Sequence, residues 1–317
     1  MLTGIQDALL IHNPAAGRRQ SRRARDLDDA RLVLRQAGIA VEIADTSRPG
    51  HAILLARQAV QQGRGMVIAC GGDGTVNEVA NGLAGSRVPL AILPAGTANV
   101  LGKELGLPWD IPSAVRRIPS GRLARIALGL AAPANPADGS GRYFVCIAGA
   151  GVDASMVYSV SSQLKQTTGT LAYWLAGLSH FFGYRIVLFS VDAGGHSFRA
   201  SQVIVGRTKH YGGPFRITTG ADLHSNCFEI AAFSTNSRFR YPAHMLAVWL
   251  SRLPRQRDVH FVHAQRVLCH ADPGTKVYVE IDGEPAGRLP VEFRIVPDAL
   301  TLVMPENETQ ARPAGVH

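Results

Sequence analysis

The sequence predicts two domains: an α/β domain built on a parallel sheet, and then a largely antiparallel β domain. The chain has 317 residues, more than the roughly 250 that a single hydrophobic core usually supports. Short apolar runs alternate with helically spaced segments at first, whereas most later segments are extended and separated by turns. We expect the first domain at residues 1–125, the second at 126–305 and a frayed polar tail at 306–317.

Strands and helices alternate through the first domain. Strands are expected at residues 8–11, 39–44, 66–70 and 90–93, and helices at residues 30–36, 51–62, 76–83 and 100–105. Such alternation builds a parallel sheet with helices on both faces.

The second domain is expected to consist mainly of strands, with a hairpin at Asp282-Gly283. The strands fall at residues 142–148, 185–192, 201–207, 228–233, 277–281, 291–296 and 300–304, with helices near 164–182 and 241–253 and a surface excursion at 133–141.

The charge balance favours anionic partners. Thirty-three Lys and Arg residues, 29 of them Arg, stand against 24 Asp and Glu, which gives a net charge of +9. Nucleotide phosphates, acidic lipid headgroups and nucleic acid all fit this excess. The densest group is Arg18, Arg19, Arg22, Arg23 and Arg25, for which a solvated helix face is the simplest interpretation.

The sequence also excludes some classes of protein. It has no run of about 18 uncharged apolar residues that would span a bilayer, and its N-terminus lacks the features of a secretory signal. We therefore expect a cytoplasmic protein. Cys70, Cys146, Cys227 and Cys269 form no CxxC pair, so they predict reduced, mostly buried thiols rather than a zinc site or a disulfide framework.

A glycine-rich loop follows the third expected strand. Residues 66–70 run into Gly71-Gly72-Asp73-Gly74-Thr75, and a helix follows. Glycines allow a ligand to approach the backbone closely, and a helix N-terminus attracts anions, so phosphate binding is expected. Because the Asp73 carboxylate would repel phosphates unless Mg²⁺ or a proton intervenes, the loop indicates metal-assisted phosphoryl transfer. A purely structural turn is the alternative.

A second loop of this kind follows the fourth expected strand. Residues 90–93 lead into Pro94-Ala95-Gly96-Thr97-Ala98-Asn99. Neighbouring loops at the carboxyl ends of parallel strands form the crevice where such folds bind ligands. Thr97 and Asn99 are candidates for contacts with phosphate or ribose, or else serve as turn and helix-capping residues.

These motifs together resemble those of the diacylglycerol kinase and sphingosine kinase family of lipid kinases, in its soluble bacterial form. The resemblance rests on Asn13-Pro14 with Gly17, Gly71–Thr75 with Asn77-Glu78, Leu93–Asn99, Gly149–Asp153, Tyr211–Gly213 and Ile281–Pro285. It implies a nucleotide-binding domain related to phosphofructokinases and NAD kinases, a C-terminal β-sandwich and ATP bound between them.

The resemblance also implies roles for particular residues. Glu284 matches the family's general base, and Thr46 matches its nucleotide-contacting threonine. The candidate nucleotide-binding residues are Asn13, Thr46, Gly71, Gly72, Asp73, Gly74, Thr75, Asn77, Glu78, Gly96, Thr97 and Asn99.

The chain departs from the family pattern at two positions. Val100 stands where the family often has Asp, so any role of that carboxylate is lost or moved. Ser225 replaces the carboxylate of the family's structural Mg²⁺ loop, and a neutral hydroxyl is a poor ligand for that ion. We therefore expect no tightly held Mg²⁺ there, and we assign no metal ligands.

The resemblance and the loops together predict an ATP- and Mg²⁺-dependent kinase that phosphorylates a primary hydroxyl of a diacylglycerol-like or sphingoid lipid. Asp73 would hold the phosphates through Mg²⁺. Glu284 would take the hydroxyl proton, or Asp73 would do so if Glu284 points away. Two alternatives are an NAD kinase and a catalytically silent nucleotide-binding protein.

The expected partners are a lipid substrate and the anionic inner surface of a membrane, with peripheral attachment. A homodimer is possible, and no nucleic acid partner is expected. The aromatic stretch 170–184, flanked by Lys165 and Arg185, is either a shallow lipid contact or a buried core helix.

Overall fold

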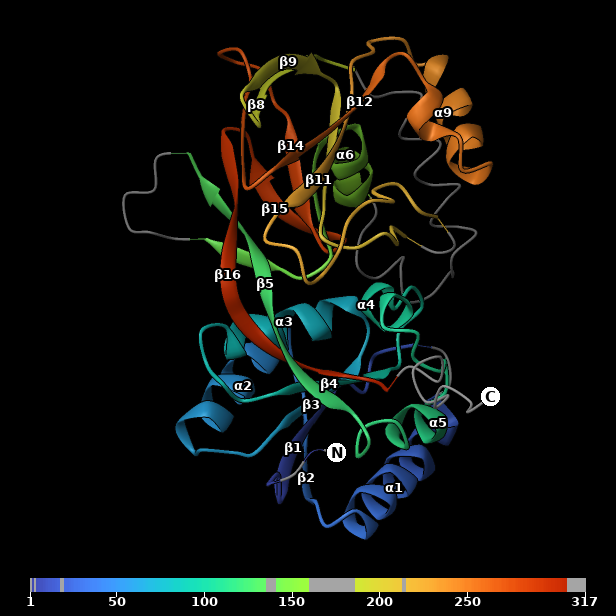
Figure 1. The fold of residues 1–317 in the computed structure, drawn as a ribbon, viewed down its shortest axis with the longest axis vertical. Coiled ribbons are helices and arrows are strands. Elements are labelled where there is room, and N and C mark those ends of the chain that lie inside the picture. The colour runs from blue at the N-terminus through green and yellow to red at the C-terminus, as the bar shows by residue number, and fades with distance from the viewer. Residues whose placement is uncertain are drawn as a thin grey trace, which may run out of the picture. The chain divides into compact units, whose positions relative to one another are not determined.

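The computed structural model describes residues 2, 4–17, 20–134, 141–159, 186–212 and 215–306. The chain divides into two compact units (Figure 1). Unit 1 comprises residues 1–126 and 298–317, and unit 2 comprises residues 127–297. Residues 298–304, which we expected in the second domain, therefore group with unit 1. The expectations for Arg18, Arg19, Lys165, the 170–184 stretch, Arg185 and the tail beyond residue 306 concern parts of the chain outside the described residues.

Unit 1 contains a parallel sheet in the strand order β2-β1-β3-β4. Its elements are β1 (Asp7–His12), α1 (Gln20–Gln36), β2 (Ala40–Asp45), α2 (His51–Gln61), β3 (Val67–Gly71), α3 (Asp73–Leu83), β4 (Leu90–Pro94), α4 (Val100–Glu104) and α5 (Ile111–Val115). The strands β1, β3 and β4 are buried along almost their whole length, as expected for a sheet covered on both faces.

Helices cover this sheet from two sides. Helices α1 and α5 pack on one face through a core that includes Leu34, Ile68 and Leu93. Helices α2 and α3 pack against each other beside the strands, where Gly82 approaches Ala56 closely (Figure 1). The α/β fold with a parallel sheet is confirmed.

Two long strands, β5 (Arg122–Pro133) and β16 (Val291–Met304), run from one unit into the other. The end of β16 joins β4 in parallel, with Leu302 opposite Leu90. We expected two strands here, separated at residues 297–299. The structure has one continuous strand, in which Asp298 departs from extended geometry with a φ of 52°; its carboxylate accepts a hydrogen bond from Arg125 at 2.8 Å.

Unit 2 is a β-sandwich. One sheet has the order β12-β11-β10-β7-β14-β15, and β16, β13, β8 and β9 pair antiparallel in the other. The remaining elements are β6 (Arg142–Phe144), β7 (Ile147–Gly151), α6 (Val152–Ser159), β8 (Phe189–Ala193), β9 (His196–Ala200), β10 (Gln202–Gly206), β11 (Phe228–Phe233), α9 (Arg240–Trp249), η1 (Leu253–Arg255), β12 (Val259–Ala264), β13 (Arg266–His270), β14 (Tyr278–Ile281) and β15 (Glu284–Arg288). Its core joins Phe189 and Phe293 of one sheet to Phe228 of the other.

The four cysteines are thiols, and three of them are buried, as predicted. Burial raises the pKa of the Cys70 thiol to about 11, so this thiol stays protonated at neutral pH. No helix in the described part of the chain is long and apolar enough to cross a membrane.

Candidate active site

Three loops meet at the carboxyl ends of β1, β3 and β4. A Cβ on Gly96 would lie 2.4 Å from the Cα of Gly72, so the second and third loops touch through their backbones. A Cβ on Gly17 would lie 2.2 Å from the carbonyl oxygen of Ala95, and Gly17 has a φ of 69°. Only glycine combines this conformation with this closeness. The structure thus brings together the two glycine loops and the 13–17 loop.

Asn13 and Thr75 link the first loop to the second. The Asn13 side-chain amide donates to the Thr75 hydroxyl at 3.0 Å, and its own oxygen accepts from the Ala15 N–H. Thr75 is buried and lies directly over Gly71, where a Cβ would approach it to 2.5 Å. Both candidate residues therefore help to fix the loops.

Asp73 links the second loop to the third. Its carboxylate accepts a hydrogen bond from the Val100 N–H, at the start of α4, at 2.6 Å. Lys103, one helical turn later, was not among the expected site residues. Burial lowers the pKa of Lys103, and the nearby Asp73 carboxylate opposes this shift. The loops therefore hold a carboxylate and a cation close enough to influence each other. A lysine one turn after a glycine loop was the available sequence signal.

Asn99 shapes the third loop. It has a φ of 47°, and its side chain both accepts from the Gly96 N–H and donates to the Gly96 carbonyl, each at 2.9 Å. Asn99 is buried, whereas Thr97 at the tip of the loop is exposed. Of these two candidates, Thr97 is the one open to a ligand.

Three further candidates near the loops make hydrogen bonds that stabilise the local fold, namely Glu78, Asn77 and Thr46. The Glu78 carboxylate accepts from the N–H groups of Gly50 and Ala52, at 2.8 and 3.1 Å, and so caps helix α2. Asn77 is buried and accepts from Asn81. The Thr46 N–H donates to the His12 carbonyl, which leaves its half-buried side chain near the end of β2.

Arg23 is a buried cation that the sequence interpretation placed on a solvated face. Its guanidinium donates to the carbonyl oxygens of Ala16, at 3.1 Å, and Ala95, at 3.5 Å. Arg23 therefore links the first loop to the third through these two hydrogen bonds. The helical spacing that places Leu27, Ala30 and Leu34 in the core also turns Arg23 inward, and this was the signal in the sequence.

The acidic hairpin of unit 2 is positioned by Asp282. Its carboxylate accepts three backbone hydrogen bonds at 2.9 Å, from Val145, Cys146 and Ile147. These bonds interrupt the extended segment predicted at 142–148, which therefore splits into β6 and β7. Asp282 and Gly283 have φ values of 46° and 78°, which confirms the hairpin turn.

Glu284 is the first residue after this turn. Its side chain is 39% exposed and forms an ion pair with Arg142, with the nitrogen and oxygen 2.5 Å apart. Behind it, buried Glu280 accepts from the Gly283 N–H at 2.9 Å. The Glu284 carboxylate is thus partly open and is paired with an arginine of β6, a strand of the other sheet.

The loop that contains Ser225, where we expected no structural Mg²⁺, surrounds the guanidinium of Arg207. Arg207 is fully buried, and its guanidinium donates to the carbonyl oxygens of Ser225, Leu223 and Ala127, at 2.5, 2.7 and 3.0 Å. Burial lowers its pKa to about 10, so it remains charged at neutral pH. These three carbonyl oxygens already accept hydrogen bonds from the positively charged guanidinium. They therefore do not fit as ligands of a Mg²⁺ ion at the same place. Nor do any three His, Cys, Asp or Glu side chains group as metal ligands would in the described ranges.

The two units together define the fold class that diacylglycerol kinases share with NAD kinases. Residues 7–131 match the diacylglycerol kinase catalytic domain, and residues 146–304 match the YegS C-terminal NAD kinase beta sandwich-like domain. The chain belongs to the diacylglycerol kinase family and is a lipid kinase.

Relatives and solved structures agree with this assignment. Diacylglycerol kinases of Staphylococcus aureus (strain MRSA252) and Bacillus subtilis (strain 168) are each 28% identical to this chain, over 90% and 96% of it and over 88% and 99% of their own lengths. A crystal structure of a diacylglycerol kinase from Bacillus anthracis shares the fold, with a TM-score of 0.75 at 22% identity over 98% of this chain and all of that one. The yeast NADH kinase complexed with NADH is more distant, with a TM-score of 0.51 at 10% identity over 99% of this chain and 90% of that one.

Proposed function

We propose that this kinase uses ATP and Mg²⁺ to phosphorylate a primary hydroxyl of a diacylglycerol-like or sphingoid lipid. The observation that supports this most is the placement of Asp73. A single carboxylate lies inside a glycine loop, bonded to the next loop, where two backbones touch at Gly72 and Gly96.

The loops have the chemistry to hold a nucleotide's phosphates. Helix α3 begins at Asp73, directly after Gly72, and a helix N-terminus favours anions. Lys103 adds a positive charge close by. Asn13 and Thr75 keep the first loop in register with the second, and exposed Thr97 contacts the nucleotide in this proposal.

Asp73 would hold Mg²⁺ against the phosphates, because a hard cation prefers carboxylate oxygen. When bound, Mg²⁺ supplies neutralisation of the charge on the transferred phosphoryl group. The protein's own contribution is to position the reactants and exclude water.

The acceptor hydroxyl must lose its proton during transfer. We assign that proton to the Glu284 carboxylate, which Arg142 orients, or to Asp73 if Glu284 points away from the acceptor. General-base catalysis of this kind contributes roughly a hundredfold or more to the rate.

The lipid acceptor places this kinase at a membrane surface. We infer that the protein is cytoplasmic and attaches peripherally to the inner face of the membrane, where anionic lipids would attract its net charge of +9.

The proposal is tested by incubating the purified protein with ATP, Mg²⁺ and detergent-dispersed diacylglycerol or sphingoid base. Mass spectrometry of the organic phase should find a lipid phosphomonoester, and its formation should stop when EDTA removes Mg²⁺. Absence of a phosphorylated lipid from every acceptor in the panel would contradict the proposal.

A further inference from the structure

Helix α9 presents an apolar face to solvent. Its inner side is buried and consists of Tyr241, His244, Ala247 and Val248. On the opposite side, the residues at positions i, i+3, i+4, i+7 and i+8, counted from Pro242, are exposed. We call Phe239, Pro242, Met245, Leu246, Trp249 and Leu250 the α9 face. Five of the nine large hydrophobic side chains that are exposed among the described residues belong to it. Scattered exposed hydrophobics are normal, but a contiguous group marks an interaction site.

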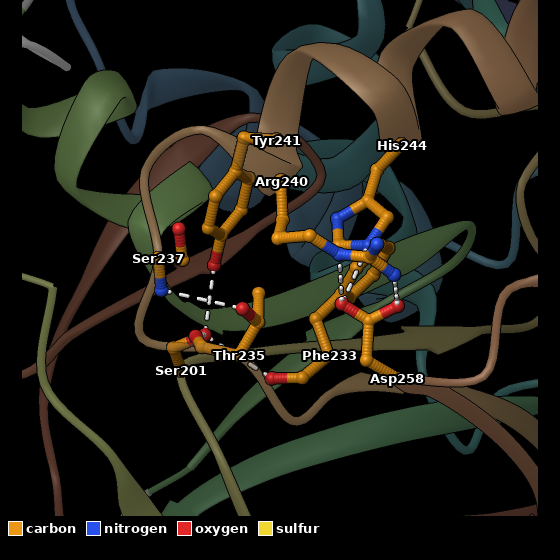
Figure 2. Close-up of polar contacts among 8 residues, drawn as sticks. All are labelled: Ser201, Phe233, Thr235, Ser237, Arg240, Tyr241, His244 and Asp258. Carbon is orange, nitrogen blue, oxygen red and sulfur yellow. Dashed lines mark hydrogen bonds and ion pairs between the residues drawn. The ribbon is translucent and has the colours of Figure 1, made fainter.

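Polar anchors fix the inner side of α9 (Figure 2). The Tyr241 hydroxyl meets the Ser201 hydroxyl at 2.8 Å, and His244 Nε2 lies 3.0 Å from Asp258. Arg240 forms an ion pair with the same carboxylate at 2.6 Å. The Phe233 ring stacks on Tyr241 and meets His244 edge-on.

The end of the helix is fixed as well. Ser251 adopts a φ of 54°, its N–H donates to the Val248 carbonyl, and the Arg252 N–H donates to the Ala247 carbonyl. This is the Schellman arrangement that closes a helix. The outward direction of Leu246 and Trp249 is therefore a consequence of several specific contacts.

The surroundings of the α9 face are basic. Residues 234–264 contain the arginines 238, 240, 252, 255 and 257, and Asp258 as their one acidic residue. All five arginines are exposed. The guanidinium of Arg240 holds the pKa of Asp258 well below its usual range, so this carboxylate is ionised and already paired.

We propose that the α9 face docks this chain onto an anionic phospholipid surface. Trp249 and Leu246 would enter the headgroup region, and Arg252 and Arg255 would meet lipid phosphates. An apolar helix face bordered by arginines and carrying a tryptophan has the chemistry of an interfacial helix.

Charge complementarity favours a lipid surface over a second copy of the chain. A symmetric dimer through the α9 face would bring two sets of arginines together, and like charges across an interface are repelled. An anionic bilayer neutralises the same arginines and covers the apolar side chains. The choice of a lipid partner rests on the proposed function, because a lipid kinase must reach an acceptor that lies in a bilayer.

Vesicle flotation tests the proposal with two matched pairs of variants. Leu246 and Leu32 are both 55% exposed, and Trp249 and Trp109 are 71% and 59% exposed, with Leu32 and Trp109 in unit 1. Binding to phosphatidylcholine–phosphatidylglycerol vesicles should fall about tenfold or more for Trp249→Ser. It should fall severalfold for Leu246→Ser, and stay unchanged for Trp109→Ser and Leu32→Ser.

The arginines supply the electrostatic part of the test. The pair Arg252→Gln and Arg255→Gln should lower binding by roughly fivefold per arginine, and added salt should weaken wild-type binding. The matched pair Arg31→Gln and Arg35→Gln, on the exposed side of α1, should bind as the wild type does. Equal losses of vesicle binding in the two pairs of variants would show that binding depends only on net charge, and would overturn the role of the α9 face.

Fluorescence of Trp249 identifies the inserted residue directly. In a variant carrying Trp109→Phe and Trp174→Phe, anionic vesicles should shift the emission to shorter wavelength, and brominated lipids should quench it. Unchanged emission from vesicle-bound protein would overturn the proposal. So would a concentration-dependent dimer in lipid-free solution that Trp249→Ser abolishes, because the α9 face would then join two copies.

Activity on a water-soluble short-chain acceptor separates this proposal from the proposed function. Trp249→Ser should keep wild-type turnover on that acceptor and lose turnover on vesicles. Vesicle binding through Trp249 without lipid phosphorylation would overturn the kinase function alone. Soluble-acceptor turnover with vesicle binding that is indifferent to Trp249 would overturn the docking surface alone.

Discussion

Asp73 allows a catalytic role to be separated from a structural one. Its carboxylate accepts the Val100 N–H at 2.6 Å. Asp73→Asn keeps an acceptor oxygen and removes the charge, whereas Asp73→Ala removes both. A hydrogen bond to a charged group contributes about 1.5–3 kcal/mol and a neutral one about 0.5–1.5 kcal/mol. We therefore expect Asp73→Asn to cost about 1 kcal/mol of the free energy of unfolding, and Asp73→Ala about 2 kcal/mol.

The expected effects on activity are different. If the charge of Asp73 holds Mg²⁺ and the phosphates, both variants should lose roughly a hundredfold or more of kcat. Thermal unfolding and lipid phosphorylation would be measured on the same preparations. A loss of 1 kcal/mol corresponds to about 2–4 °C in the unfolding midpoint of a unit of this size, so folded protein remains for the activity assay.

Asp110→Asn is the matched control. The Asp110 carboxylate accepts the Ser113 N–H at 2.8 Å and caps helix α5, in the same unit but outside the three loops. It should lose similar stability and keep its activity. Near wild-type turnover of Asp73→Asn beside an inactive Asp73→Ala would refute the reasoning, because the hydrogen bond to Val100 would then account for the whole effect.

Four other predictions follow from the geometry. Glu284→Gln, whose amide oxygen can still accept from Arg142, should lower kcat by roughly a hundredfold with nucleotide affinity unchanged; equal losses in turnover and binding would make Glu284 a binding residue. Arg207→Met removes the guanidinium that donates to three backbone carbonyls, those of Ala127 and Leu223 in buried residues and that of half-buried Ser225, and should lower the free energy of unfolding in urea by about 3–5 kcal/mol. Dialysed wild type should contain no Mg²⁺, whereas about one ion per chain by metal analysis would contradict the internal-cation account. The pKa of Asp258 is lowered in the folded state, first of all by its hydrogen bond with Arg240. This pairing therefore stabilises the fold above about pH 4, and the stabilisation is lost as the pH falls further. Asp258→Asn should flatten the fall of the free energy of unfolding in acid, and an unchanged acid slope would show that another carboxylate dominates.

Continuous apolar runs made the parallel sheet of unit 1 predictable. Strands β1, β3 and β4 are buried on both faces, and each is followed by a glycine-containing turn that sets the end of the strand. Strands such as β9 and β13 were not predicted, because their short sequences carry polar or charged residues that face solvent. The hydrophobic pattern is weak where only one face of a strand is covered.

The site was predictable where the function depends on local sequence. The loops at Gly71–Thr75 and Gly96–Asn99 lie together in unit 1, as their positions after neighbouring strands indicated. Contacts between distant residues were not visible in the sequence. Glu78 caps a helix that begins 27 residues earlier at His51, and Arg207 finds its carbonyl partners only in the folded chain.

Helix α9 shows the limit of pattern reasoning most clearly. Its sequence is apolar nearly all round, and this pattern usually predicts a buried helix. The structure buries Tyr241 and His244 and leaves Leu246 and Trp249 exposed. A hydrophobic pattern identifies apolar faces but cannot say whether protein or lipid covers each of them.

The most direct test of the central claim is where the phosphoryl group goes. Purified protein would be incubated with γ-labelled ATP, Mg²⁺, a panel of diacylglycerols and sphingoid bases, and NAD in the same reaction, with Asp73→Asn as the blank. We predict label in an organic-soluble phospholipid and none in NADP. Label in NADP would make this chain an NAD kinase, and absence of label from both would leave a nucleotide-binding protein without catalysis; either result contradicts the account.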